Sequence, residues 1–425
     1  MKHPYECGST QHELSRRQWL GSMAGATAGV GMSSLLEPAI ADELKSRQQQ
    51  FLLIWLDGGI SQLESWDPKP GNEFGGPYRA IPTKLPGVHV SELMPKTAQQ
   101  MHRLSVVRSM STKDENHSSG VPRILRGDPK NRGVTYPYLG AAMAKLKGDP
   151  KSPLPNYVWV KPGSGGYIWQ HAGFLGSRYG ALALGDGKPP IHINRPPEIT
   201  EEVDQERNAL RVRINQRFRQ RRRESELDAY EYSFETAQQI IRRRDLFDDP
   251  DPKDAERYGS HPLGRHILQS RRLLEAGVLF VQCHSYHWDT HADNFNMHHD
   301  LVPQIDQPFA ALLEDLDDRG MDNVMVILMS EFGRTPKINQ RAGRDHWPEA
   351  WSLAMAGSGI RRGHVVGKTT PNGAWVDGPE YDIGHVFHTV FKAAGIDPSE
   401  TEYLNNGQPL PIAHDDCGVI DELLA

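Results

Sequence analysis

Short apolar runs separated by longer polar segments recur along the chain. Residues 51–56 read FLLIWL without interruption, which suits a strand buried on both faces, as in a parallel sheet under helices. Runs of strand length also occupy residues 104–110, 157–160, 277–283, 323–329 and 351–356. Helices are predicted near 94–104 and over 308–319 and 385–395. This pattern predicts an α/β fold.

A segment of different character covers residues 199–260. Arginines crowd positions 207–223, and glutamates flank them on both sides. Mixed charges at helical spacing are typical of a solvated helical face rather than of a nucleic-acid or membrane surface. We therefore predict a charged helical insertion or one outer layer here.

The first apolar run ends at Asp57, followed by Gly58 and Gly59. Open α/β sheets bind ligands at the carboxyl ends of their strands, and two glycines leave room for a ligand or metal near the backbone. In the alternative interpretation, Asp57 caps the next helix and Ser61 is a turn residue. This stretch alone does not separate the two.

The run that ends at residue 283 leads into the sequence HSYHWDTHADNF. Its imidazoles and carboxylates belong to His284, His287, Asp289, His291 and Asp293. Alternating ligands of these two kinds after a strand are typical of a zinc or transition-metal site. The alternative is a loop of surface histidines.

Two more groups of polar residues follow predicted strands. Glu331 comes directly after the run 323–329, and the pair Asp345–His346 follows shortly after it. Arg334 and Arg344 are candidates for holding an anionic group by bidentate hydrogen bonds. His117 lies in a polar turn where a helix is expected to begin, and a helix amino terminus favours anions.

The amino terminus carries export signals. Arg16 and Arg17 form a twin-arginine pattern, a weakly apolar run follows, and residues 39–41 read AIA, a cleavage-site pattern. Residues 1–41 are thus predicted to be a signal peptide and 42–425 the mature domain, periplasmic or extracellular and without a transmembrane span. The net charge of −6 implies no general affinity for nucleic acid, and three cysteines make no disulfide framework.

The motifs LDGGISQLESWDPKP, ENHSSG, WDTHADNF, SEFGRTP and GRDHW, in this order behind the leader, resemble a broad family of exported bacterial proteins of unknown function. That family is grouped with the alkaline phosphatase and sulfatase superfamily. The resemblance implies a three-layer α/β/α sandwich with a mostly parallel central sheet. It also implies one or two bound metals and the hydrolysis or transfer of sulfate or phosphate groups.

Carried over by position, the resemblance implies a set of metal ligands: Asp57, Asp289, His291, Glu331, Asp345 and His346. The position of the superfamily's nucleophile, counted ten residues back from Gly127, falls on His117. A histidine there can be a ligand, a general acid or base, or a nucleophile, or it can mark a lost activity. Ser61 is the second candidate for catalysis.

These observations predict an exported hydrolase of sulfate or phosphate esters that uses a divalent metal ion, namely zinc, calcium or magnesium. The expected substrate is an anionic ester such as a sulfated or phosphorylated polymer, held by Arg334 or Arg344. The competing hypothesis is a non-catalytic exported binding protein that keeps the fold. The absence of the usual nucleophile favours that hypothesis, whereas the retained acids and histidines oppose it, since buried unpaired carboxylates are costly without a metal.

Overall fold

The strand β1 (Gln50–Leu56) lies in the middle of a nine-stranded sheet, and all of its residues are buried. The computed structural model describes residues 48–127, 133–189, 196–219 and 224–425, so the predicted signal peptide lies outside the described residues. The strand order is β13-β4-β12-β9-β1-β8-β5-β7-β6. Only β12 and β6 run antiparallel to their neighbours, which makes the sheet mostly parallel, as predicted.

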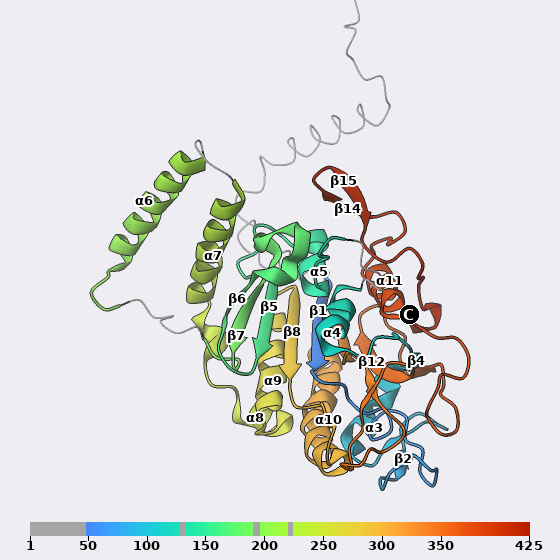
Figure 1. The fold of residues 1–425 in the computed structure, drawn as a ribbon. Coiled ribbons are helices and arrows are strands. Elements are labelled where there is room, and N and C mark those ends of the chain that lie inside the picture. The colour runs from blue at the N-terminus through green and yellow to red at the C-terminus, as the bar shows by residue number, and fades with distance from the viewer. Residues whose placement is uncertain (1–47, 128–132, 190–195, 220–223) are drawn as a thin grey trace, which may run out of the picture. The chain divides into compact units, whose positions relative to one another are not determined.

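Each face of β1 contributes to a separate core. Leu52 and Ile54 pack into a cluster that includes residues of α9 (Pro262–Glu275) and α10 (Asn294–Asp318). Phe51 and Trp55 point the other way, into a cluster shared with α5 (Leu139–Lys147) and α11 (Ile383–Ala393). Because successive side chains of a strand alternate between faces, an unbroken apolar strand needs helices on both sides. The result is a three-layer α/β/α arrangement (Figure 1).

The remaining elements have the following bounds. The other strands of the large sheet are β4 (Leu104–Met110), β5 (Tyr157–Lys161), β6 (Gly166–Ile168), β7 (Ala181–Gly185), β8 (Phe280–Ser285), β9 (Val324–Met329), β12 (Trp351–Gly357) and β13 (His364–Val366). Two-stranded ribbons are formed by β2 (Ala80–Pro82) with β3 (His89–Ser91), β10 (Gly333–Arg334) with β11 (His346–Trp347), and β14 (Glu402–Asn405) with β15 (Gln408–Pro411). The other helices are α3 (Pro95–Gln100), α4 (His117–Arg126), α6 (Glu201–Arg219), α7 (Glu224–Arg242) and α8 (Pro252–Tyr258), with short 3-10 turns η1 (Met101–Arg103), η2 (Trp169–Leu175), η3 (Ser177–Tyr179), η4 (Arg244–Phe247) and η5 (Asp421–Leu423).

The segment predicted as a charged insertion contains α6, α7 and α8 and no strand among its described residues. Helix α6 is exposed along almost its whole length, as its mixed charges indicate. No helix in the described part of the chain is long and apolar enough to cross a membrane.

One predicted helix was wrong in its length. The sequence places a helix at 308–319, whereas α10 begins at Asn294 and includes both Pro303 and Pro308. Proline removes one backbone hydrogen bond and disfavours a helix interior, so the polar stretch before Pro308 is easily read as a loop. Burial of Val302, Ile305 and Phe309 against the sheet offsets that cost.

Candidate metal centre

The strands β1, β8 and β9 lie side by side and end at the same edge of the sheet. Their registers pair Trp55 with His284 on one side and with Met329 on the other. The loops after these strands therefore carry Asp57, Asp289 and Glu331 to one place, as parallel strands require. The ribbon of β10 and β11 pairs Arg334 with His346 and so returns the later Asp-His pair to this edge.

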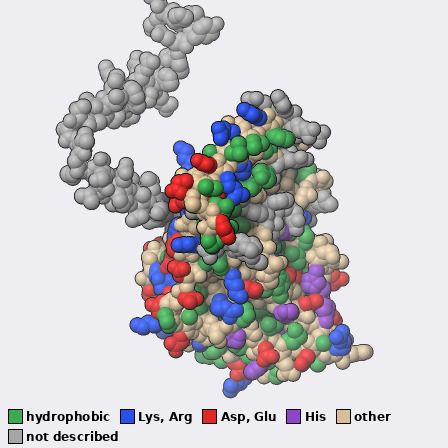
Figure 2. Space-filling model, turned by 90° about the vertical axis from the view of Figure 1, so that its left-hand side faces the viewer, with side chains coloured by type: hydrophobic (Ala, Val, Ile, Leu, Met, Phe, Trp, Pro, Cys, Tyr) green, Lys and Arg blue, Asp and Glu red, His purple; other side chains and the backbone are tan. Residues whose placement is uncertain are grey.

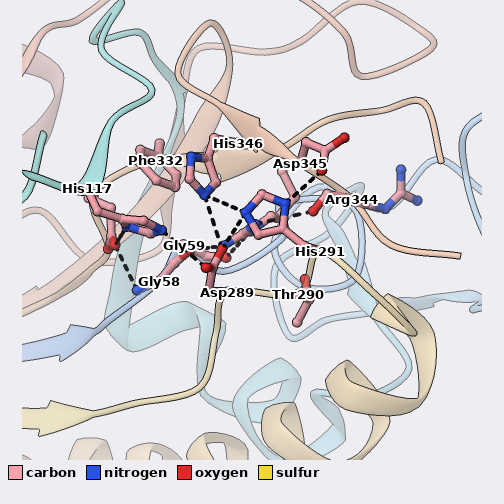
Figure 3. A network of polar contacts seen from close by, with 12 residues as sticks. Gly58, Gly59, His117, Asp289, Thr290, His291, Phe332, Arg344, Asp345 and His346 are labelled. Carbon is pink, nitrogen blue, oxygen red and sulfur yellow. Dashed lines mark hydrogen bonds and ion pairs between the residues drawn. The ribbon is translucent and has the colours of Figure 1, made fainter. Parts of the chain in front are cut away.

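Three histidines surround the carboxylate of Asp289 (Figure 3). Nε2 of His117 lies 3.3 Å from Oδ2 of Asp289. Nε2 of His291 and Nε2 of His346 each lie 3.1 Å from Oδ1, and these two nitrogens are 2.9 Å apart. Three nitrogen atoms and the two oxygens of one carboxylate, from segments that follow β4, β8 and β9, thus meet within a few ångströms.

The opposite nitrogen of each ring contacts an oxygen. Nδ1 of His117 lies 2.9 Å from Glu331, Nδ1 of His291 lies 2.7 Å from Asp345, and Nδ1 of His346 lies 2.6 Å from the carbonyl oxygen of Glu115. Carboxylate and carbonyl oxygens accept hydrogen bonds, so these contacts place a proton on each Nδ1, and each Nε2 can offer a lone pair to a metal ion once it gives up any proton shared with Asp289. Metal-binding histidines are commonly held in this way.

Lone pairs and a carboxylate at such distances repel one another unless a positive charge lies between them. The donor set of three imidazole nitrogens and Asp289 therefore fits a metal ion. His117, Asp289 and His346 have ligand atoms that all lie within 4.8 Å of one another. Oε2 of Glu331 is buried and has no hydrogen-bond partner, so it is one further donor. Nitrogen-rich sites suit zinc, whereas calcium and magnesium prefer oxygen ligands.

Electrostatics in the cluster favour a charged Asp289 and a basic His117. Burial opposes ionisation of Asp289, but the hydrogen bond with His346 and the charge of Arg334 outweigh it and lower the pKa of Asp289 well below its ordinary range. The hydrogen bond to Glu331 raises the pKa of His117 despite partial burial. Burial raises the pKa of Asp57 and of Glu331. A cation in the cluster would therefore favour the ionised forms of Asp57 and Glu331, which burial alone disfavours.

Asp57 lies at the border of this cluster. Its carboxylate accepts a hydrogen bond from Nε1 of Trp55 at 3.3 Å, and the charges of both His117 and Asp289 act on it. Gly58 follows with φ +119°, and a Cβ there would lie 2.4 Å from the amide nitrogen of Asp289. Only glycine therefore lets the end of β1 approach the loop that carries Asp289.

Glu331 and Asp345, predicted as ligands, contact the Nδ1 side of the imidazoles, away from Asp289. Oε1 of Glu331 accepts hydrogen bonds from His117 and from the amide of Gly58, at 2.9 and 2.8 Å. Asp345 accepts from Nδ1 of His291 and from the side chain of Asn339. In this geometry both residues orient ligands, and Glu331 alone keeps a buried oxygen that no hydrogen bond occupies.

The two arginines predicted to hold substrate are fully buried. Arg344 directs all five of its N–H groups to protein oxygens: the carboxylate of Glu64 at 2.8 and 3.0 Å, and the carbonyls of Phe74, Thr335 and Pro336. Arg334 contacts Asp289 at 2.6 Å and donates to the carbonyl oxygens of Gly58, Gly59 and Arg344. Arg334 thus fixes Asp289, and Arg344 fixes the loop behind it.

Ser61, the second catalytic candidate, has no exposed surface. Its amide donates to Nε2 of His298 at 3.0 Å, and its hydroxyl is buried without a hydrogen-bond partner. His284, from the histidine-rich run, is also buried and packs 4.4 Å from the ring of Trp159. The cluster takes only Asp289 and His291 from that run.

Sequence reasoning missed two contributors to the cluster. The carbonyl of Glu115 orients His346, and the ring of Phe332 stacks on His346 with centroids 4.4 Å apart. A backbone carbonyl leaves no trace in residue type. Phe332 stands within the motif SEFGRTP, which is the only signal that points to it.

Solved structures that match include the PsFucS1 sulfatase from Pseudoalteromonas sp., at 13% identity and a TM-score of 0.40, with 91% of this chain and 74% of that chain covered. A phosphonate monoester hydrolase of Agrobacterium radiobacter matches at 10% identity and 0.39, with 88% and 77% covered. The alkaline phosphatase of the Antarctic bacterium TAB5 matches at 12% identity and 0.34, with 82% and 99% covered.

A comparison with curated protein sequences finds no match. A family model described as "Protein of unknown function (DUF1501)" matches residues 48–424, nearly the whole described chain. The chain therefore belongs to the DUF1501 family.

Proposed function

We propose that this protein is an exported, metal-dependent hydrolase of sulfate or phosphate esters. One observation carries the proposal: three imidazoles, each with its Nδ1 proton held by an oxygen, direct their Nε2 lone pairs at Asp289. Such a set of donors is costly to assemble without a cation. The similarity of the sequence motifs to the sulfatase and alkaline phosphatase superfamily supports the class of reaction.

His291, His346 and Asp289 would hold the metal ion, for which zinc is the first choice, and Nε2 of His117 would stay free for proton transfer. A bound metal ion would polarise the ester oxygens and stabilise the charge that develops on them. Arg334 keeps Asp289 ionised and in place through their 2.6 Å contact. Asp345 and Glu331 keep the imidazoles in the tautomer that offers Nε2.

His117 is the residue we assign to proton transfer. Its side chain is 37% exposed, and the carboxylate of Glu331 behind it is fully buried. When water attacks the sulfur or phosphorus atom, Nε2 of His117 can accept the proton that the water loses, while Nδ1 keeps its own proton in the hydrogen bond to Glu331. The same proton can then pass to the departing alcohol oxygen, so that the alcohol and free sulfate or phosphate leave and His117 is neutral again.

The test uses the mature protein and measures metal content together with hydrolysis of 4-nitrophenyl sulfate and 4-nitrophenyl phosphate. The wild-type protein should contain about one or two metal ions per chain and hydrolyse one of these esters. Asp289→Asn should lose both properties. His117→Ala should lose at least about a hundredfold in rate. His102→Ala, which changes an exposed histidine elsewhere, is the matched control and should behave as wild type.

The outcomes separate the hypotheses. Wild-type protein that binds metal but hydrolyses neither ester favours the binding-protein alternative. Wild-type protein that binds no zinc, manganese, calcium or magnesium contradicts the metal centre itself. Export is tested separately: replacing Arg16 and Arg17 by lysine should retain the precursor in the cytoplasm, and normal export of that variant would contradict the twin-arginine route.

A further inference from the structure

Helix α6 presents an unusual surface for a protein of this size. Only Asn215 among its 19 residues is buried. Helix α6 contacts α7 through the guanidinium of Arg211, which lies 4.4 Å from the ring centre of Phe234. In Figure 1, α7 stands between α6 and the sheet, so most of the surface of α6 has no neighbour in the described part of the chain.

Large apolar side chains lie on this exposed surface. Val203, Leu210, Ile214 and Phe218 are 40%, 50%, 47% and 54% exposed. Figure 2 shows apolar and charged side chains intermixed over this part of the molecule. The four residues are spaced seven, four and four positions apart, which places them in one stripe about 80° wide on the helix. Arg207 lies in the same stripe between Val203 and Leu210, and the apolar side chains that face solvent along the rest of the stripe indicate a contact surface.

The charges beside the stripe change sign along the helix. Acids occupy its first turns, including Glu202 and Glu206, and arginines occupy its second half, including Arg213 and Arg217. Their spacings of four, seven and four positions place these residues in one band about 60° wide, so they form a single flank along the stripe. The flank is thus acidic at one end and basic at the other.

We propose that α6 pairs in an antiparallel manner with α6 of a second copy of this chain, which forms a two-fold symmetric dimer. In that arrangement the acidic end of the flank meets the basic end of its copy. Val203 then lies opposite Phe218, and Glu206 opposite Arg213, because both pairs are centred on the middle of the helix near Leu210. A parallel pair would instead set this flank against the opposite flank of the partner helix, where Arg211 already contacts Phe234 of α7.

The size of the contact sets its strength. A helix of 19 residues is about 28 Å long, and two such helices form an interface at the lower end of the biological range. We therefore expect a dimer that dissociates on dilution rather than an obligate one. The contact does not depend on the proposed hydrolase activity, because α6 contributes no residue to the cluster around Asp289.

Sedimentation velocity over a range of protein concentrations tests the proposal. Wild-type protein should shift from monomer to dimer as its concentration rises. Leu210→Ser and Phe218→Ser should each weaken association at least about tenfold. Leu404→Ser is the matched control, since Leu404 is 75% exposed on β14, away from the stripe, and it should associate as wild type. Monomeric wild-type protein at every concentration, or association that both α6 variants leave unchanged, would overturn the proposal.

Charge exchange tests the orientation. Glu206→Arg and Arg213→Glu should each weaken the dimer, since each sets like charges opposite one another twice, and the double variant should restore it. Cysteine cross-linking in a Cys417→Ser background gives a second measurement. Val203→Cys protein mixed with Phe218→Cys protein should form mixed disulfide dimers. Cross-links within each single variant instead of the mixture, or a double charge variant that stays as weak as the single ones, would overturn the antiparallel arrangement.

Discussion

Oε1 of Glu331 accepts two hydrogen bonds, from Nδ1 of His117 at 2.9 Å and from the amide of Gly58 at 2.8 Å. One buried oxygen thus connects the first residue of α4 with the turn that follows β1. The carboxylate holds His117 in the tautomer with a free Nε2 and adds negative charge behind it. We infer that Glu331 sets the position of His117 as well as its basicity.

Glu331→Gln should therefore weaken metal binding about 10–100-fold at pH 8, which is typical when a carboxylate that orients the side chains around a metal is changed. Glutamine has nearly the same shape, so the thermal midpoint of the metal-free protein should change little. Competition with a chromophoric chelator measures the affinity. Glu349→Gln, which changes a carboxylate that pairs with Lys113 on the surface, is the control. Unchanged affinity in Glu331→Gln would show that the contact with His117 is unimportant for the metal.

Removal of the metal should lower the thermal midpoint of the wild-type protein. A ligand that binds only the folded state stabilises it, by about 2.7 kcal/mol when free ligand is at a hundred times its Kd. Because Asp289 lies at the focus of the three imidazoles, Asp289→Asn should show no shift when a chelator is added. Scanning calorimetry with and without chelator compares the two proteins. A chelator-induced shift of equal size in both would place the metal elsewhere.

The framework of the fold could be predicted because its signals are local. The run FLLIWL is buried throughout, and the strand expected at 104–110 has those bounds in the structure. The carboxyl ends of parallel strands meet at one edge whatever the loops do, so the meeting of Asp57 and Asp289 follows from topology. The sequence does not predict that β12 is antiparallel to β9, because an apolar run has the same pattern in either strand direction.

The roles of individual residues at the site could not be predicted in the same way. Glu331 and His117 are 214 positions apart, and Glu64 and Arg344 are 280 apart. Residue type alone does not tell whether Glu331 binds a metal or orients a ligand, nor whether Arg344 meets a substrate or a buried carboxylate. These roles depend on which partners the folded chain supplies.

Arg344 should act on stability rather than on substrate binding. Its guanidinium and the carboxylate of Glu64 are both fully buried and make a bidentate pair. Arg344→Met should cost about 3–5 kcal/mol of unfolding free energy, because it leaves the buried charge of Glu64 without its ion pair and with the amide of Asn294 as its remaining contact. The double variant with Glu64→Gln should lose less than the sum of the single variants. Urea titration measures these costs, and a loss of substrate affinity without a loss of stability would contradict the structural role.

His298 lies beneath the site, and its Nε2 accepts a hydrogen bond from the amide of Ser61. Burial lowers the pKa of His298 to about 4, whereas a histidine in an unfolded chain titrates near 6.5. Between these two values the unfolded state binds a proton that the folded state does not. The free energy of unfolding should therefore be complete above about pH 6.5 and fall as the pH is lowered, by at most about 1.4 kcal/mol per pH unit from this residue.

His298→Gln tests this dependence, because its side-chain oxygen can still accept the Ser61 amide but does not titrate. The variant should lose less stability than the wild-type protein between pH 6.5 and pH 4.5, even if it is less stable at pH 7.5. Urea titrations at several pH values give both curves, and His102→Gln, which changes an exposed histidine, is the control. Curves for wild type and His298→Gln that run parallel through this range would show that burial of His298 does not suppress its protonation. If the slope of unfolding free energy against pH is smaller in the variant by the equivalent of about one proton, that part of the acid sensitivity belongs to the contact between His298 and Ser61.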